Sequence, residues 1–279
     1  MSILEAILIG IVQGLSEFLP ISSTAHMTLA GRALGVIESP ESWTAFIAVV
    51  QLGTLAAVLA YFRRDLIAIT RDFIRENIER KPLRQQSANS RMGWYIIFGT
   101  IPIALIGMLA KDFIEGAFTK NLIVIGSSLF VLGIILEIAE RKGKFEREIN
   151  QTTLSDALWV GLAQVLALIP GSSRSGTTIT AGMFLGLKRE AAARFSFLLS
   201  IPAIGASGVL EIFEAVKHLD SSGIAALIVA TVVAGVSGYL CIAFLIRYLR
   251  TRTTRIFVFY RCLLGGGILV AILLKWLEP

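Results

Sequence analysis

The chain has 279 residues, of which 55% are hydrophobic and only 16% charged, and its formal net charge is +6 at pH 7. The mean hydropathy is +0.74. Apolar runs of about 17 to 25 residues recur along the whole chain, which is the length of a helix that crosses a bilayer. Because these runs are continuous rather than alternating, they exclude a β-barrel. The composition therefore predicts an all-α polytopic membrane protein.

The apolar segments follow one another from the first residues to the last. They cover 3–19, 20–36, 43–62, 92–110, 121–139, 155–170, 171–187, 195–216, 222–246 and 256–277. The first segment lacks a basic region and a small-residue cleavage site, so we expect no signal peptide. Cys241 and Cys262 lie in apolar segments without the spacing of metal ligands, and we interpret them as core residues.

The basic residues gather in a few of the connections between these segments. The connections after 43–62, 121–139, 171–187 and 222–246 hold Arg63, Arg64, Arg71, Arg75, Arg80, Lys81, Arg84, Arg91, Arg141, Lys142, Lys144, Arg147, Lys188, Arg189, Arg194, Arg247, Arg250, Arg252 and Arg255. The positive-inside rule places these connections in the cytoplasm. The need for basic residues in these connections also explains the high isoelectric point of the chain, so the charge does not indicate a nucleic-acid partner. Because the connection before 155–170 and the one after 171–187 are then both cytoplasmic, these two segments enter and leave the membrane on the same side and form a re-entrant hairpin.

The two halves of the chain resemble each other. The stretch "GIVQGLSEFLPISSTAHMTLAG" (10–31) is similar to "GLAQVLALIPGSSRSGTTITAG" (161–182), and a Pro-x-Ser-Ser turn occurs in both. The repeat of about 150 residues divides a single membrane domain, 1–279, into halves at 1–150 and 151–279. Each half is expected to hold one re-entrant hairpin and three spanning helices, so the second half is inverted. Broken helices at matching positions of inverted repeats indicate a site at the midplane, where the two turns should face each other.

The second turn, "PGSSRSGTT" (170–178), has the chemistry of an anion site. Pro170 breaks one helix and the serines restart another, whose N-terminus suits a phosphate. Gly171 and Gly176 allow close approach of the backbone, and hydroxyl groups surround them. Arg174 adds a planar fork that can hold two phosphate oxygens. The alternative is a structural arginine that pairs with a carboxylate.

The first turn, "QGLSEFLPISSTAH" (13–26), carries groups that could do chemistry. Gln13 and Glu17 are four residues apart and share a helix face before the break. Ser23 and His26 are three apart after it, and opposite a phosphate they suggest a nucleophile and its acid/base partner. Glu17 would orient the imidazole or hold a metal. The alternatives are a capping serine and a histidine satisfied within the protein.

These two turns closely resemble the signatures of the undecaprenyl-diphosphate phosphatase family, known also as the bacitracin-resistance proteins. The similarity extends to "FIAVVQLGTLAAVLAYF" (46–62), "FSFLLSIPAIGAS" (195–207) and "YRCLLGG" (260–266). The resemblance implies an enzyme of the bacterial cytoplasmic (inner) membrane that hydrolyses undecaprenyl diphosphate to undecaprenyl phosphate and phosphate. Such an enzyme recycles the lipid carrier for peptidoglycan synthesis and confers bacitracin resistance. Its active site would face the outer, periplasmic side.

The resemblance also implies roles for residues. Ser23 would be the nucleophile, His26 its acid/base partner and Glu17 the supporting carboxylate or metal ligand. The diphosphate would be held by Ser22, Ser173, Arg174, Ser175, Gly176 and Thr178. The family uses a divalent cation, Mg²⁺ or Ca²⁺. Gln13 stands where many members have glutamate, and a neutral amide can give a hard cation one oxygen.

Other functions stay open from the sequence. An inverted-repeat transporter or flippase could use the same cradle for an anion or a polyprenyl phosphate, and a scaffold protein is disfavoured by the intramembrane Glu17 and Arg174. Water or His26 could be the attacking group in place of Ser23. The expected partners are the polyprenyl lipid, whose tail lies among apolar helices open sideways to lipid, and the bilayer. No nucleic acid is expected, and a homodimer is left open.

Overall fold

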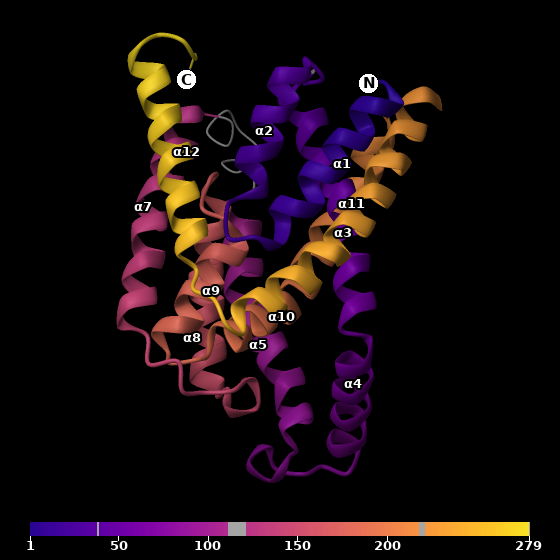
Figure 1. The fold of residues 1–279 in the computed structure, drawn as a ribbon. Coiled ribbons are helices and arrows are strands. Elements are labelled where there is room, and N and C mark those ends of the chain that lie inside the picture. Colours follow the sequence, from indigo (N-terminus) through magenta and orange to yellow (C-terminus); the bar gives the residue numbers. More distant parts are fainter. Residues whose placement is uncertain (38, 111–120, 218–220, 279) are drawn as a thin grey trace.

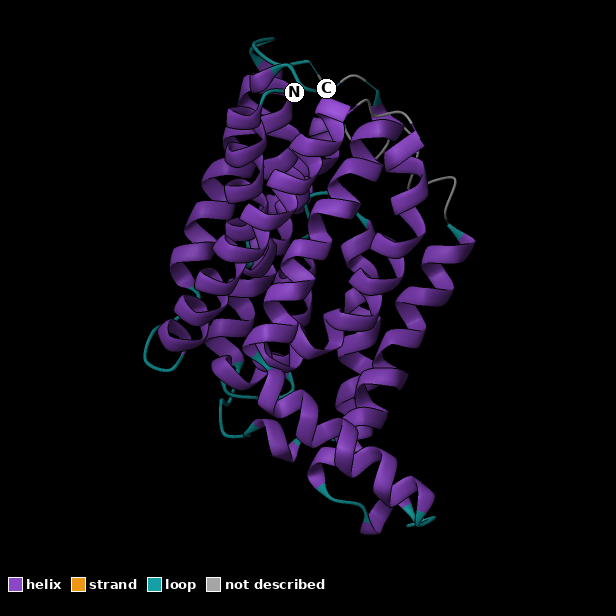
Figure 2. Ribbon diagram, turned by 90° about the vertical axis from the view of Figure 1, so that its right-hand side faces the viewer, coloured by secondary structure: helices purple, strands orange, loops and turns teal. Residues whose placement is uncertain are grey.

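A computed structural model describes residues 1–37, 39–110, 121–217 and 221–278 of the chain. Figures 1 and 2 show helices and loops, and no strand, in this part of the protein. The helices are α1 (Ile3–Phe18), α2 (Ser23–Leu34), α3 (Pro40–Tyr61), α4 (Arg63–Ile78), α5 (Ala88–Leu109), α7 (Leu122–Lys142), α8 (Leu154–Val165), α9 (Arg174–Phe184), α10 (Arg189–Lys217), α11 (Ser221–Leu249) and α12 (Arg255–Leu273). Short 3₁₀ turns lie at Leu83–Gln85, Ile149–Gln151 and Leu166–Leu168. The predicted all-α fold is confirmed.

Six helices in the described residues are long and apolar enough to cross a membrane: α3, α5, α7, α10, α11 and α12. Helices α1, α2, α8 and α9 have 16, 12, 12 and 11 residues. A helix needs about 20 residues to cross the hydrocarbon core, so these four are too short to span it. They form two pairs, α1–α2 and α8–α9, as the sequence predicted.

The α8–α9 pair closes on itself at one end. Arg147, in the loop before α8, bonds Asp156 in the first turn of α8 (Nη1 to Oδ1, 3.1 Å) and the carbonyl of Leu185 just after α9 (2.9 Å). In Figure 1 this closed end lies low, whereas α1 and α2 open toward the upper end, where both chain termini lie. The arrangement agrees with the expected hairpins, while the inverted relation between the two halves stays a prediction.

The basic connection after α3 is a helix, which the sequence prediction missed. Residues 63–91 have too many charges to register as an apolar segment, but α4 is amphipathic and turns Ile69, Asp72 and Glu76 inward. Asn89 donates to Asp72 (2.8 Å), and the backbone N–H of Ser87 donates to Glu76 (2.8 Å). These bonds dock α4 against the start of α5, which begins at Ala88 rather than at 92.

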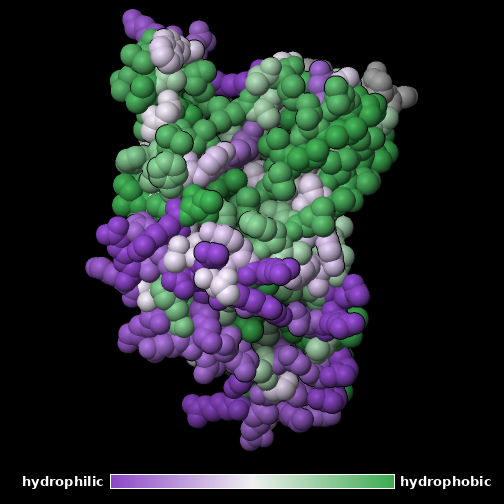
Figure 3. Space-filling model, in the orientation of Figure 1, coloured by the Kyte–Doolittle hydropathy of each residue, from purple (hydrophilic) through white to green (hydrophobic). Residues whose placement is uncertain are grey.

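Polar and apolar residues separate along the molecule. Figure 3 shows apolar side chains over the upper part and hydrophilic ones over the lower part, where α4 and the starts of α5, α8, α10 and α12 lie in Figure 1. The four basic connections therefore share one end, as the positive-inside argument requires. Which side of the membrane this end faces stays a prediction. The sequence also predicts that the connections poor in basic residues, with Lys111, Lys120 and Lys217, lie outside. The segment 111–120 and the side chain of Lys217 are outside the described residues.

Both hairpins are held in the centre by close packing. Phe18, at the end of α1, packs edge-on against Phe197 of α10 with ring centroids 5.2 Å apart. Ile179 and Met183 of α9 belong to the same buried core. Helices α7 and α12 approach so closely that a Cβ on Gly265 would lie 2.6 Å from the carbonyl oxygen of Gly126. Small residues allow such contacts, which drive helix association in lipid.

Candidate active site

Each hairpin turns at a proline. A residue before proline is pushed into extended conformation, and Leu19 (φ −64°, ψ 141°) and Ile169 (φ −80°, ψ 123°) both adopt it. The helical backbone therefore ends at Phe18 in the first hairpin and at Leu168 in the second. Pro20 and Pro170 thus create irregular backbone deep in the protein, as the sequence predicted.

A serine in a strained conformation starts the next helix in each hairpin. Ser22 (φ 76°) caps α2 and Ser173 (φ 69°) caps α9, and their hydroxyls accept from the N–H groups of Ala25 and Gly176. Positive φ costs a non-glycine residue about 1–3 kcal/mol and persists at functional sites. Ser23 and Arg174 are therefore the first residues of their helices, where backbone N–H groups attract anions.

The two turns lie against each other, as expected. Arg174 donates through Nη2 to Oε1 of Glu17 (2.7 Å), and Ser175 donates to the carbonyl of Leu19 (3.0 Å). Gln13 donates through Nε2 to the other oxygen of Glu17 (2.9 Å). Gln13 and Glu17 thus share a helix face as predicted. Arg174 also pairs with a carboxylate, which the sequence analysis treated as the alternative to anion binding.

The ion pair between Arg174 and Glu17 leaves part of the arginine guanidinium unused. Arg174 Nη1 is buried and has no hydrogen-bond partner among the described residues, and the same holds for Gln13 Oε1 and Ser172 Oγ. Buried polar groups are nearly always bonded, so unpaired ones indicate a place for a ligand or water. Arg174 can therefore hold Glu17 and still offer a donor to an anion.

His26 is fixed on both sides of its ring. Nδ1 lies 2.7 Å from the carbonyl oxygen of Ser22, which can only accept, so Nδ1 carries a proton. Nε2 lies 2.6 Å from the hydroxyl of Tyr260, whose ring stacks on the imidazole at a centroid distance of 5.5 Å. Ser23 is half-buried, and no hydrogen bond engages its hydroxyl in the described part of the chain. The structure thus places Ser23 and His26 on one helix without a direct bond between them.

The hydroxyls along α9 serve mainly to fix the helix. Ser173 Oγ and Ser175 Oγ lie 3.1 Å apart. Thr178, which is fully buried, donates to the carbonyl of Arg174 (2.7 Å), and its hydroxyl lies 2.6 Å from that of Ser196 on α10. Protein groups therefore already engage the hydroxyls of Ser175 and Thr178. Their predicted contact with a diphosphate stays a prediction.

Arg261 is a central residue whose role the sequence analysis missed. It is 1% exposed, and its guanidinium donates to the carbonyls of Pro20 (3.1 Å), Ser172 (2.9 Å) and Leu129 (3.2 Å). It thus joins both turns to α7. No ion pair involves Arg261 among the described residues, so its positive charge is uncompensated. The signal in the sequence was an arginine inside the apolar segment 256–277, since such residues are functional by default.

The donor set at the site fits a divalent cation only together with a substrate. Glu17 is the one carboxylate that the described contacts place there, and no group of three or more His, Cys, Asp or Glu residues that could hold a metal occurs among the described residues. Hard cations accept one or two carboxylates when substrate phosphates supply further oxygens. The unpaired Oε1 of Gln13, fully buried beside Glu17, is a second oxygen donor of the right kind.

Together these features define an integral membrane protein in which two broken helical hairpins and two arginines, Arg174 and Arg261, meet at one candidate site. Residues 6–267 match the family described as bacitracin resistance protein BacA. The chain belongs to this family, as the sequence predicted. Related proteins named undecaprenyl-diphosphatase occur in Syntrophobacter fumaroxidans (strain DSM 10017 / MPOB), Myxococcus xanthus (strain DK1622) and Chlorobium limicola (strain DSM 245 / NBRC 103803 / 6330).

These relatives match over nearly their full length. The Syntrophobacter protein is 55% identical over 272 residues, which is 96% of this chain and 97% of that protein. The Myxococcus protein is 47% identical and the Chlorobium protein 48% identical, each over 279 aligned residues. These alignments cover 100% and 97% of this chain, and 92% and 96% of the two relatives.

Proposed function

We propose that this protein hydrolyses undecaprenyl diphosphate to undecaprenyl phosphate and inorganic phosphate. The relatives carry the name of this activity. The observation that carries the proposal is Arg174, whose Nη1 is buried and unpaired at the start of α9 while Nη2 holds Glu17. The product would return the lipid carrier to cell-wall synthesis, and removal of free diphosphate lipid would confer bacitracin resistance.

Binding of the diphosphate follows from charge. Arg174 Nη1 and the first N–H groups of α9 donate to the phosphate oxygens, and the uncompensated charge of Arg261 lies behind both turns. Phosphoryl transfer depends mainly on positioning and on stabilisation of developing charge. The fixed dipoles and guanidinium groups of this site supply both.

Ser23 is the proposed nucleophile. Its Oγ forms a bond to the terminal phosphorus, and the bond from that phosphorus to the bridging oxygen breaks, so that the lipid phosphate leaves. Nε2 of His26, released by Tyr260, accepts the hydroxyl proton. Water then hydrolyses the phosphoserine and restores the hydroxyl of Ser23. Glu17 keeps Arg174 in place during both steps through the bond between Oε1 and Nη2.

A divalent cation, Mg²⁺ or Ca²⁺, is part of the proposal. Glu17 and Gln13 Oε1 would hold it, and when bound it would neutralise charge on the diphosphate. With only one carboxylate, the protein binds the divalent cation weakly when no substrate is present. Metal dependence should therefore appear mainly when the diphosphate is present.

The site is proposed to face the outer side of the bacterial inner membrane. Support comes from the α1–α2 hairpin, which opens away from the basic end of the molecule (Figures 1 and 3). Single cysteines in place of Arg75 and Arg250 should label from the cytoplasm, and one in place of Gly35 from outside, after both native cysteines are changed to alanine. Labelling of all three from one side would contradict this orientation.

The test of the activity is phosphate release from a long-chain polyprenyl diphosphate by the purified protein in detergent, with and without chelator. Release that stops on chelation and returns with Mg²⁺ or Ca²⁺ is expected. A folded preparation that releases no phosphate would show the proposal to be wrong and would favour carriage of the anion by the same site.

A further inference from the structure

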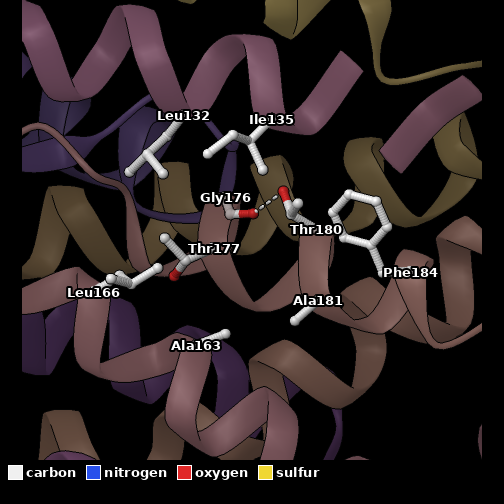
Figure 4. Close-up of a pocket in the computed structure, with 9 residues that line it drawn as sticks. All are labelled: Leu132, Ile135, Ala163, Leu166, Gly176, Thr177, Thr180, Ala181 and Phe184. Carbon is white, nitrogen blue, oxygen red and sulfur yellow. Dashed lines mark hydrogen bonds between the residues drawn. The ribbon is translucent and has the colours of Figure 1, made fainter. Parts of the chain in front are cut away.

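A cavity of about 160 Å³ lies between α7, α8 and α9, directly beside the turn that holds Arg174 (Figure 4). Leu132 and Ile135 of α7 form one wall, and Ala163 of α8 with Leu166 forms the opposite one. Helix α9 forms the back of the cavity. The cavity therefore uses the second hairpin and one spanning helix.

The walls of this cavity are hydrocarbon even where α9 contributes threonines. Thr180 donates its hydroxyl to the carbonyl of Gly176 (2.6 Å), and Thr177 donates to the carbonyl of Arg174 (3.1 Å). Both hydroxyls are thus satisfied within their own helix. A cavity without free polar groups does not bind water or phosphate well, so the expected occupant is apolar.

The position of the cavity connects it to the anion site on one side and to lipid on the other. Gly176 and Thr177 lie in the first turn of α9, two and three residues after Arg174. Leu166 and Phe184, which also line the cavity, are 42% and 47% exposed, so the cavity opens to the outer surface of the helices. A molecule with an anionic head and an apolar chain could therefore place the head at Arg174 and the chain in this cavity.

We propose that this cavity binds the first isoprenoid units of the substrate, next to the diphosphate. The proposal rests on the proposed function above and adds the subsite that holds the lipid. A prenyl chain gains little free energy on moving from bilayer to protein, because lipid is as apolar as the cavity wall. The cavity therefore contributes by orienting the reacting phosphorus, which is a positional effect on the rate.

A larger groove elsewhere fits this role less well. The groove between α3 and α11 has a volume of about 520 Å³ and is also apolar. Its lining includes Gly53, Ala57 and Gly235 but no residue of either hairpin. A chain seated there would not start at Arg174. The smaller cavity is therefore the one that can determine where the diphosphate lies.

The test fills the cavity from α8. Ala163→Val and Ala163→Leu add successively more volume at a half-buried wall position. Ala206→Leu, on the exposed surface of α10 away from the cavity, is the matched control. The measurements are kcat/KM for a long-chain prenyl diphosphate and for the short farnesyl diphosphate, and the inhibition constant of inorganic diphosphate.

The expected result is graded. Ala163→Leu lowers kcat/KM at least tenfold, about 1.4 kcal/mol, for both prenyl substrates, and Ala163→Val lowers it less. Inhibition by inorganic diphosphate, which has no chain, stays as in the wild type, and so does every value for Ala206→Leu. Unchanged kcat/KM in Ala163→Leu would overturn the subsite, as would a loss confined to the long chain. Failure of the wild type to cleave any prenyl diphosphate would instead overturn the proposed function.

Discussion

Arg261 provides the sharpest test of how the two hairpins are held together. Arg261→Met keeps the volume of the side chain but removes the donors to Pro20 and Ser172, which belong to different turns. Each bond from a charged donor contributes about 1.5–3 kcal/mol. Part of this loss is offset because a buried cation no longer has to be desolvated. We expect a net loss of about 2–4 kcal/mol in the free energy of unfolding.

Activity should fall more than stability suggests, because the bonds to Pro20 and Ser172 also set the distance between the turns. Unfolding in mixed micelles gives the free energy, and phosphate release gives kcat/KM. Gly176→Ala is an independent way to disturb the same group, since a Cβ at residue 176 would lie 2.5 Å from Arg261 Nη1. Its effect should shrink in the Arg261→Met background, where the guanidinium is absent.

If Arg261→Met unfolds with the wild-type free energy and keeps its turnover, the carbonyl contacts of Arg261 do not hold the site. Arg261→Lys serves as the control for charge. It keeps the cation but cannot reach three carbonyls from separate elements, so it should lie between the wild type and methionine.

Three further predictions concern the catalytic groups and the α4 connection. Arg174→Lys should lower kcat/KM about 100-fold, because a point charge cannot hold Glu17 and an anion through two separate nitrogens; near-normal turnover would refute the clamp. Ser23→Ala should abolish turnover yet keep inhibition by inorganic diphosphate, and a variant that stays active would identify water or His26 as the attacking group. In α4, the bonds from Asn89 and then Arg71 lower the pKa of Asp72 below its ordinary 3.8, and the N–H of Ser87 lowers the pKa of Glu76 below 4.5. A carboxyl group whose pKa is lower in the folded protein than in the unfolded chain stabilises the fold at pH values above its ordinary pKa. This stabilisation is lost as the pH falls through the lowered pKa of the folded state. Hydrogen exchange of residues 63–90, corrected for intrinsic rates, should therefore rise below about pH 4; exchange that stays constant there would contradict this.

Much of the fold could be predicted because a bilayer imposes strong rules on a sequence. Spanning helices must be long and apolar, so hydropathy predicted α3, α7, α11 and α12 with bounds that differ from the observed ones by at most four residues. Pro20 and Pro170 indicated where the hairpins turn, because each stands beside a Ser-Ser pair that can start a new helix. A proline alone does not determine a turn, since Pro102 and Pro202 lie inside α5 and α10. Helix α4 was missed because its charged residues break any apolar run, although its amphipathic spacing was a local signal for a helix. Its contact with α5, such as that from Asn89 to Asp72, could not be predicted, because no local pattern encodes a partner.

The sequence by itself determined the class of the protein, its two matching turns and the residues Glu17, Ser23, His26 and Arg174 as candidates. Each of these follows from local chemistry: a proline, a charge that hydrocarbon penalises, or a fixed spacing on one helix. Only the tertiary structure decided which groups meet. It paired Arg174 with Glu17, gave both nitrogens of His26 partners, and brought Arg261 beneath both turns. Such contacts join residues far apart in the chain, and packing of whole helices, rather than any local preference, determines them.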